Sequence, residues 1–193
     1  MYMKYLSNSW LVILSVTSML ACQPKATETT EDQAASVDQT ESASEAEQRP
    51  SPLEIKDGQI SGKNISVHYG SPSVKGRTVW GDLVPYNIVW RTGANEATYI
   101  DIPQDILVEG KSLAIGKYSL FTIPKENGSW TVIFNSDWDL EHGHFQYDEK
   151  NDVLRVEVLP VWESTSAEKL SIDIESPGLV IRWEKLKLPI SIK

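Results

Sequence analysis

The chain has 193 residues, a formal net charge of −9 at pH 7 and one cysteine. An acidic chain without a stripe of Lys and Arg argues against nucleic acid, and against an anionic membrane surface, as a partner. One cysteine also excludes an intramolecular disulfide, so a folded domain must be held together by its own core.

Residues 1–21 have the composition of a bacterial lipoprotein signal peptide. Lys4 precedes the apolar run WLVILSVTSML, which is too short to cross a bilayer core of about 30 Å. The small residue Ala21 stands directly before Cys22, as in a lipobox. We expect cleavage before Cys22, lipidation at this residue and anchoring in the bacterial cell envelope, on the periplasmic face or the surface of the outer membrane. The alternative is an ordinary signal peptide that leaves a free thiol.

Residues 22–52 are rich in Thr, Ser, Ala, Gln and acidic residues. Seven acidic residues stand against Lys25 and Arg49, so the segment repels itself, and it has too few large apolar residues to form a core. We predict a disordered acidic tether between the lipidated cysteine and a folded domain. An export or sorting address directly after Cys22 is the alternative.

Residues 53–193 are predicted to form a single all-β domain. From Ile60 onward, apolar and polar residues alternate with a period of two. The alternating runs are NISVHY, TYIDI, WTVIF, VLRVEV, LSIDI, LVIRW and LKLPISI. Asn127–Gly128 predicts a tight hairpin turn, YDEKND and ESPG predict further turns, and Pro189 predicts an edge strand. About eight to ten short strands without a long helix favour an antiparallel β-sandwich or jelly-roll-like fold.

Six of the seven tryptophans lie in this domain. Trp130 and Trp183 are in phase with the apolar faces of their strands, which predicts core positions. Trp80, Trp138 and Trp162 stand near turns, where a core position and an exposed aromatic platform for a sugar or peptide are both open.

The string VPYNIVWRTGANEATYIDI has two interpretations. In the first, residues 92–95 form a hairpin loop, and Arg91 and Glu96 make a cross-strand ion pair worth roughly 0.2–1 kcal/mol. Gly93 and Asn95 then supply the positive φ angles of the loop. In the second interpretation, Arg91, Asn95 and Glu96 are ligand contacts.

The aromatic residues Tyr86 and Trp90 would form the wall of such a ligand pocket. The loop GSPSVKGR carries Lys75 and Arg77, two cations that could receive a carboxylate or a phosphate. An ordinary surface turn with solvated charges is the alternative for this loop.

The string DWDLEHGH is the candidate metal site. Asp137, Asp139 and Glu141 offer oxygen ligands, and His142 and His144 are spaced as a chelating pair for zinc or copper. A more distant His68 is a possible third imidazole. A solvated acidic loop is the alternative, so the sequence predicts no cofactor beyond this weak divalent-metal site. Sequence motifs for a serine nucleophile or a phosphate-binding loop are absent.

Four strings carry a resemblance to a known family: KGRTVWGDLVPYNIVWRTGANEATYIDI, VEGKSLAIGKYSLFTIP, WTVIFN and YDEKNDVLRVEV. They resemble the uncharacterised bacterial domain-of-unknown-function family 2911. The resemblance implies a secreted or lipid-anchored envelope protein without an established activity. Family members commonly have a WGAF-like segment where this chain has LEHGHF, so both histidines of the candidate metal site lie where this chain departs from the pattern.

The sequence as a whole favours a non-catalytic, lipid-anchored envelope module that binds a glycan, a peptide or another envelope component. The first alternative is a hydrolase or metal-dependent enzyme that uses Arg91, Glu96 and the Asp137–His144 loop. The second is a purely structural envelope lipoprotein. The identity of the ligand and the oligomeric state are open at this stage.

Overall fold

The computed structural model describes residues 49–193, so the expected signal peptide, Cys22 and the tether up to residue 48 lie outside the described residues. Ten strands and two short 3-10 helices form this part: β1 (Leu53–Ile60), β2 (Lys63–Gly70), β3 (Tyr99–Ile102), β4 (Ile106–Val108), β5 (Lys111–Leu113), β6 (Gly116–Ile123), β7 (Trp130–Asn135), η1 (Gly143–Gln146), η2 (Glu149–Asn151), β8 (Asp152–Val158), β9 (Val161–Glu175) and β10 (Gly178–Ser191). The predicted all-β class is therefore confirmed. Within residues 49–193, no helix has the length and apolar character needed to cross a membrane.

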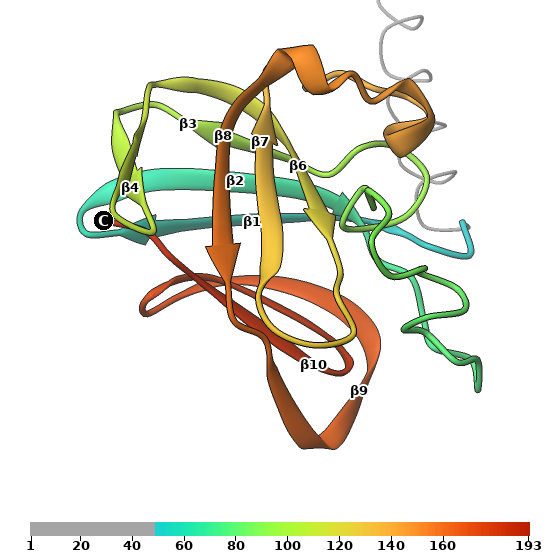
Figure 1. Cartoon of the computed structure of the whole chain (residues 1–193). Helices are drawn as coiled ribbons and strands as arrows, with labels where there is room; N and C mark the ends of the chain where they lie inside the picture. Colours follow the sequence, from blue (N-terminus) through green and yellow to red (C-terminus); the bar gives the residue numbers. More distant parts are fainter. Residues whose placement is uncertain (1–48) are drawn as a thin grey trace, which may run out of the picture.

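The strands form one large sheet and a long hairpin. The large sheet has the order β1-β2-β3-β6-β7-β8, β9 pairs with β10, and β4 with β5 forms a small separate ladder. All of these pairs are antiparallel. The β9–β10 hairpin packs against one face of the large sheet (Figure 1), so the antiparallel sandwich-like arrangement agrees with the prediction.

The main core lies between the large sheet and the β9–β10 hairpin. Ile65, Val67 and Tyr69 of β2 are buried in the predicted phase, because alternate side chains of a strand point to the same face. Trp130 and Trp183, with 0% and 1% of their surface exposed, occupy the predicted core positions.

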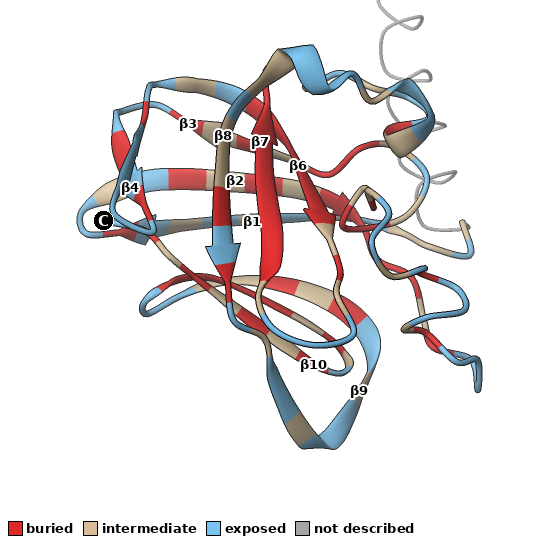
Figure 2. Ribbon diagram, viewed as in Figure 1, coloured by how far each residue is buried: buried red, intermediate tan, exposed pale blue. Residues whose placement is uncertain are grey.

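Strand β7 is buried on both faces (Figure 2). On the face turned away from the hairpin, Ile133 packs with Phe121 and Ala97 in a second, smaller cluster. Leu140 and Tyr147, from the segment between β7 and β8, pack against this cluster. An alternating pattern indicates only one buried face of a strand. The second face of β7 is buried because the β7–β8 connection covers it, and that connection has no periodic pattern that would predict this.

The predicted turns are present. Gly128 adopts φ 85 in the β6–β7 turn, where Asn127–Gly128 predicts a hairpin. The runs LVIRW and LKLPISI belong to the single strand β10, whose register shifts on both sides of Glu184. Pro189 lies beyond Lys187, the last ladder pair of β10 with β9, which confirms its predicted edge position.

Candidate functional site

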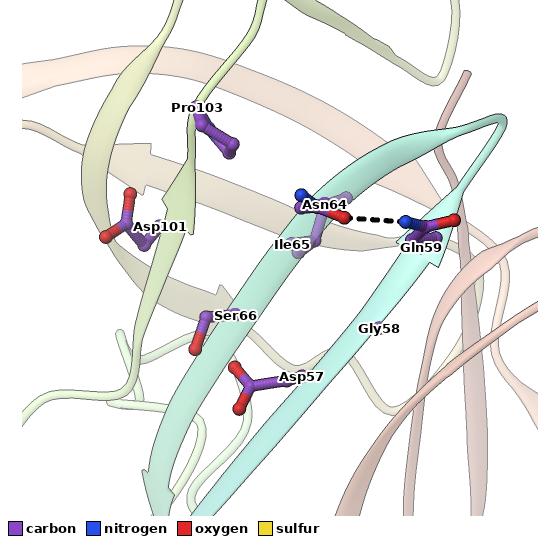
Figure 3. A pocket seen from close by; sticks show the side chains of 8 residues that line it. All are labelled: Asp57, Gly58, Gln59, Asn64, Ile65, Ser66, Asp101 and Pro103. Atoms are coloured by element: carbon purple, nitrogen blue, oxygen red, sulfur yellow. Dashed lines mark hydrogen bonds between the residues drawn. The ribbon is translucent and has the colours of Figure 1, made fainter.

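A groove of about 520 Å³ lies on the outer face of β1, β2 and β3 (Figure 3). Asp57 and Asp101 flank Ser66 at neighbouring positions of the three strands. The Ser66 hydroxyl lies 3.1 Å from Nε2 of His68. The two flanking carboxylates would repel an oxyanion formed at this hydroxyl, so the groove lacks the electrostatics of a nucleophilic site.

A cleft of about 330 Å³ has the opposite electrostatic character. It lies between the loop after β2, the segment before β3, η1 and β10. Its lining contains two arginines, one histidine, apolar side chains and no carboxylate: Ser51, Pro72, Arg77, Leu83, Val84, Trp90, Arg91, Gly93, Ala94, Asn95, His144 and Trp183. We call it the arginine cleft.

Arg91 is fixed in the arginine cleft by its neighbours. Its Nε donates to Nδ1 of His144 at 3.1 Å, and its Nη1 donates to the backbone oxygen of Asn95. The ring centroid of Phe145 lies 5.6 Å from the guanidinium carbon. Burial lowers the pKa of Arg91, and the charge of Glu96 offsets part of this effect. These contacts leave Nη2 without a hydrogen-bond partner among residues 49–193.

Gly143 makes room for the side chain of Arg91. It adopts φ 54, and a Cβ atom at this position would lie 2.6 Å from Cδ of Arg91. A larger residue would therefore combine a strained backbone with a steric clash. The start of η1 thus sets the path of the Arg91 side chain.

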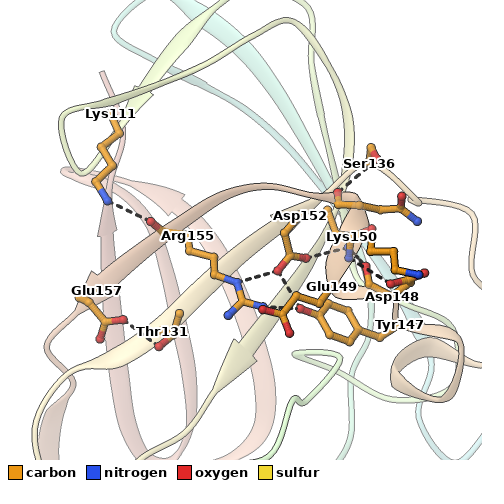
Figure 4. A network of polar contacts seen from close by, with 12 residues as sticks. Lys111, Thr131, Ser136, Tyr147, Asp148, Glu149, Lys150, Asp152, Arg155 and Glu157 are labelled. Atoms are coloured by element: carbon orange, nitrogen blue, oxygen red, sulfur yellow. Dashed lines mark hydrogen bonds and ion pairs between the residues drawn. The ribbon is translucent and has the colours of Figure 1, made fainter.

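A network of polar contacts holds the segment that carries η1 (Figure 4). The Tyr147 hydroxyl donates to Oδ2 of Asp152 at 2.7 Å, and Nε of Arg155 donates to the same oxygen at 2.6 Å. Asn135 donates to the other oxygen of Asp152 at 2.8 Å. Burial and the bond to Asp152 raise the pKa of Tyr147 far above its ordinary value. This network anchors the segment between β7 and β8 to the sheet.

Arg77 is also held by main-chain oxygens. Its Nε donates to the carbonyl of Val74 at 3.1 Å, and its Nη2 donates to the carbonyl of Ser73 at 2.5 Å. Both bonds stay within its own loop, and Nη1 has no hydrogen-bond partner among residues 49–193.

Five arginines lie in the described part of the chain. Arg49, Arg155 and Arg182 each pair with at least one carboxylate. Arg77 and Arg91 have no carboxylate partner among residues 49–193, and both line the arginine cleft. The cleft therefore gathers the two guanidinium charges that this part of the protein does not neutralise.

His144 is neutral in this arrangement. A guanidinium can only donate, so Nδ1 of His144 must be unprotonated to accept the bond from Arg91, and the ring proton is on Nε2. Burial and the charge of Arg91 lower the pKa of His144, which also favours the neutral ring.

Aromatic rings form the floor of the arginine cleft. Trp90 and Trp183 stack at a centroid distance of 5.8 Å, and Nε1 of Trp90 donates to the oxygen of Gly93 at 3.2 Å. Both rings contact Trp80, which is partly buried, whereas Trp162 at the edge of the same cluster is 46% exposed. Trp138 lies elsewhere, against the ring of Tyr99 and beneath the ammonium of Lys117, so it does not extend the floor.

The predicted hairpin around residues 92–95 is wrong. No strand precedes it: Trp90 makes an isolated bridge with Thr122 of β6, and β3 begins only at Tyr99. Asn95 has a positive φ of 65, as predicted, but the other positive φ belongs to Thr92 and not to Gly93.

Gly93 is required for a different reason. A Cβ atom on Gly93 would lie 2.7 Å from the hydroxyl of Thr98. The predicted ion pair between Arg91 and Glu96 is also wrong, because the Glu96 carboxylate pairs with Arg49 in the segment before β1. Arg49 and Glu96 are 47 residues apart in the sequence, so no local pattern indicates that they pair.

Of the predicted ligand contacts, Arg77, Trp90, Arg91 and Asn95 meet in the arginine cleft. The other three do not line it: Tyr86, Lys75 and Glu96. Tyr86 packs beside Gly81, the backbone nitrogen of Lys75 donates to Glu168, and Glu96 borders a separate hollow. The sequence did not indicate Ser51, Pro72, Leu83, Val84 and Trp183 as lining residues. The apolar alternation around Trp183 predicts a buried side chain, which is correct, but it does not show that this side chain also forms the floor of a cleft.

The predicted metal site is not assembled. Among residues 49–193, no group of three or more His, Cys, Asp or Glu side chains is placed to hold a metal ion. Nδ1 of His144 accepts from Arg91, and Asp137 accepts from Asn151 at 2.5 Å. Asp139 borders the separate hollow beside Trp138. The extended geometry assumed for this segment is replaced by a turn and η1, which separates the candidate ligands.

The family described as "Protein of unknown function (DUF2911)" matches residues 51–192. The chain belongs to this family. The region matched to DUF2911 begins at Ser51 and includes every residue that lines the arginine cleft. No curated protein and no solved structure matches the chain, so the membership in DUF2911 brings no activity with it.

Proposed function

We propose that this domain is a non-catalytic binding module that holds the anionic group of a small molecule in the arginine cleft. One observation carries the proposal: Arg77 and Arg91, which lack a carboxylate partner among residues 49–193, line the same cleft. Their remaining donors and the absence of a carboxylate from the lining suit an anion and disfavour a cation.

The environment of Arg91 supports this proposal. Its guanidinium is partly buried, and burial lowers its pKa by more than the nearby charge of Glu96 restores, so its charge is held at an energetic cost and without a hydrogen-bonded carboxylate. A bound anion would remove part of that cost and gain charge-assisted hydrogen bonds. The cleft volume of about 330 Å³ is within the ordinary range for small-molecule sites.

We further propose that the module acts at the bacterial envelope, anchored through Cys22. The signal-like residues 1–21 and the acidic residues 22–52 support this placement. Within the envelope, the arginine cleft favours an acidic small molecule over a neutral glycan.

The binding proposal is tested by calorimetric titration of the full chain, purified in detergent, with benzoate, phenyl phosphate and benzyl alcohol. The three probes share one ring and differ in charge. We expect at least one anion to bind and the alcohol not to bind. Arg91→Gln should lower the affinity for the anion by about tenfold or more, because a hydrogen bond to a charged group contributes roughly 1.5–3 kcal/mol.

The matched control is Lys75→Gln, which removes a cation from the same loop as Arg77 but outside the cleft lining. It should leave the affinity unchanged within about twofold, since a surface charge acts only weakly through solvent. If neither anion binds, or if the alcohol binds as well as the anions, the proposed function is wrong.

The anchor is tested separately by mass spectrometry of the N-terminal peptide and by cell fractionation. The peptide should begin at Cys22 and carry acyl chains, and Cys22→Ser should move the protein from the membrane to the soluble fraction. An unmodified thiol at Cys22 in the mature protein would contradict the anchor.

A further inference from the structure

The fixed charge of the arginine cleft is larger than one anion of unit charge can balance. Arg77 and Arg91 contribute two positive charges, and the lining contains no carboxylate. His144 adds no charge while it accepts from Arg91. A monoanion would leave one guanidinium unbalanced, whereas a phosphate monoester carries about −1.5 to −2 charges at pH 7 and can balance both.

The uncommitted donors of the cleft also exceed the capacity of a planar carboxylate. Arg77 retains Nη1, because its Nε and Nη2 bind main-chain oxygens. Arg91 retains Nη2, because its Nε and Nη1 bind His144 and Asn95. His144 retains the Nε2 proton. Two of the donors come from different parts of the β2–β3 connection and the third comes from η1, an arrangement that suits an anion with three terminal oxygens pointing in different directions.

The wall of the cleft indicates what the anion is attached to. Leu83, Val84, Pro72 and Trp90 line it beside the arginines, and Leu83 is 42% exposed at the surface. Phe145, which lies against Arg91, is 80% exposed. Apolar side chains exposed around a cationic centre are suited to cover an apolar substituent of a bound anion.

We infer that the ligand of the arginine cleft is a small phosphate monoester with an apolar substituent, held by Arg77, Arg91 and His144. This inference rests on the proposed anion-binding function and specifies the class of the anion. The phosphate lies between the two guanidiniums and the imidazole, and the substituent lies along the apolar wall.

The test compares three probes with the same ring in calorimetric titrations of the full chain in detergent. Phenyl phosphate is a dianion, methyl phenyl phosphate is a monoanion with the same phosphorus centre, and benzoate is a monoanion with two oxygens. The titrations are made at about pH 8, above the second ionisation of the monoester near 6. Phenyl phosphate should bind about tenfold or more tightly than either monoanion, a difference of about 1.4 kcal/mol.

The variant His144→Asn tests the third donor. An asparagine side-chain oxygen can accept from Arg91 in place of Nδ1, while the Nε2 donor is lost. This variant should weaken the binding of phenyl phosphate several-fold more than the binding of benzoate. Arg77→Gln and Arg91→Gln should each reduce the preference for the dianion, and Lys75→Gln should preserve it. Thermal unfolding of each variant shows that it is folded.

The outcomes separate this inference from the proposed function. If benzoate or methyl phenyl phosphate binds as tightly as phenyl phosphate, in a manner that depends on Arg91, the cleft binds anions but the inference of a monoester is overturned. If no anionic probe binds, both are overturned. If His144→Asn lowers the affinities for phenyl phosphate and benzoate by the same factor, His144 is not a third hydrogen-bond donor to the phosphate.

Discussion

Arg155 and Arg91 contact the same connecting segment between β7 and β8, and they differ in whether a carboxylate of the fold balances their charge. Arg155 donates to Asp152, whose side chain is only 9% exposed, and to the Tyr147 hydroxyl. Arg91 donates to a neutral imidazole and a main-chain oxygen, neither of which carries a formal charge. The first arginine has its counter-ion within the fold. The second is positioned by the fold but has no carboxylate partner among residues 49–193, which is the basis for proposing that it binds an anion.

The largest effect expected from this comparison is on stability. Asp152→Ala removes the shared acceptor of Tyr147, Arg155 and Asn135. It should lower the free energy of unfolding by about 2–3 kcal/mol, because partly buried donors lose their partner. Urea unfolding monitored by tryptophan fluorescence measures this change.

The comparison variant is Arg77→Gln, which removes a guanidinium without a carboxylate partner. It should change the free energy of unfolding by less than about 0.5 kcal/mol, as for an ordinary surface substitution. Similar losses in Asp152→Ala and Arg77→Gln would contradict the distinction between a structural network and a binding cleft.

A second prediction concerns the glycine beneath Arg91. Gly143→Ala places a Cβ atom 2.6 Å from Cδ of Arg91 at φ 54, whereas Gly62→Ala has a similar φ of 79 and nothing within 4 Å. Both changes should cost about 1–2 kcal/mol of stability through the left-handed backbone, and Gly143→Ala should cost more than Gly62→Ala because of the clash with Arg91. Only Gly143→Ala should also weaken the binding of phenyl phosphate, by about tenfold, because Arg91 is displaced.

The binding loss is measured by the same titration in both variants at a temperature where both are folded. Equal affinities in Gly143→Ala and Gly62→Ala would show that the position of Arg91 is not set by η1.

Much of the fold was predictable because strand periodicity is a local property. The buried faces of β2, β3 and β8 follow from alternation, and the β6–β7 turn follows from Asn127–Gly128. The second buried face of β7 was not predictable, since it is created by an irregular segment that folds back over the sheet. Periodicity contains no information about such a cover.

The candidate site was predictable only as a set of residue types. The sequence marks Arg77 as a cation able to receive a carboxylate or phosphate and Arg91 as a candidate ligand contact, but their meeting in one cleft depends on how the long connection between β2 and β3 folds. The incorrect pairing of Arg91 with Glu96 came from an assumed hairpin. The fold instead gives Glu96 a partner, Arg49, which is far away in the sequence.

A third prediction tests that revised pairing. The side chains of Arg49 and Glu96 are 29% and 43% exposed, so Glu96→Gln should lower the free energy of unfolding by no more than about 1 kcal/mol, as for other surface ion pairs. The affinity for phenyl phosphate should stay within about twofold of that of the unsubstituted protein, since Glu96 does not line the arginine cleft and makes no hydrogen bond to Arg91. A much tighter complex in Glu96→Gln would show that Glu96 neutralises Arg91 after all.

The smallest expected effect is a dependence of stability on pH through His144. Burial and the charge of Arg91 lower the pKa of His144 in the folded state, so below the ordinary value of about 6.5 the unfolded chain takes up a proton first. Stability should therefore fall as the pH decreases through this value and level off once the folded protein is protonated. His144→Asn should flatten the decrease without removing it, because burial also lowers the pKa of His68. Urea unfolding across this pH range measures the effect, and an unchanged slope in His144→Asn would mean that folding does not lower the pKa of His144.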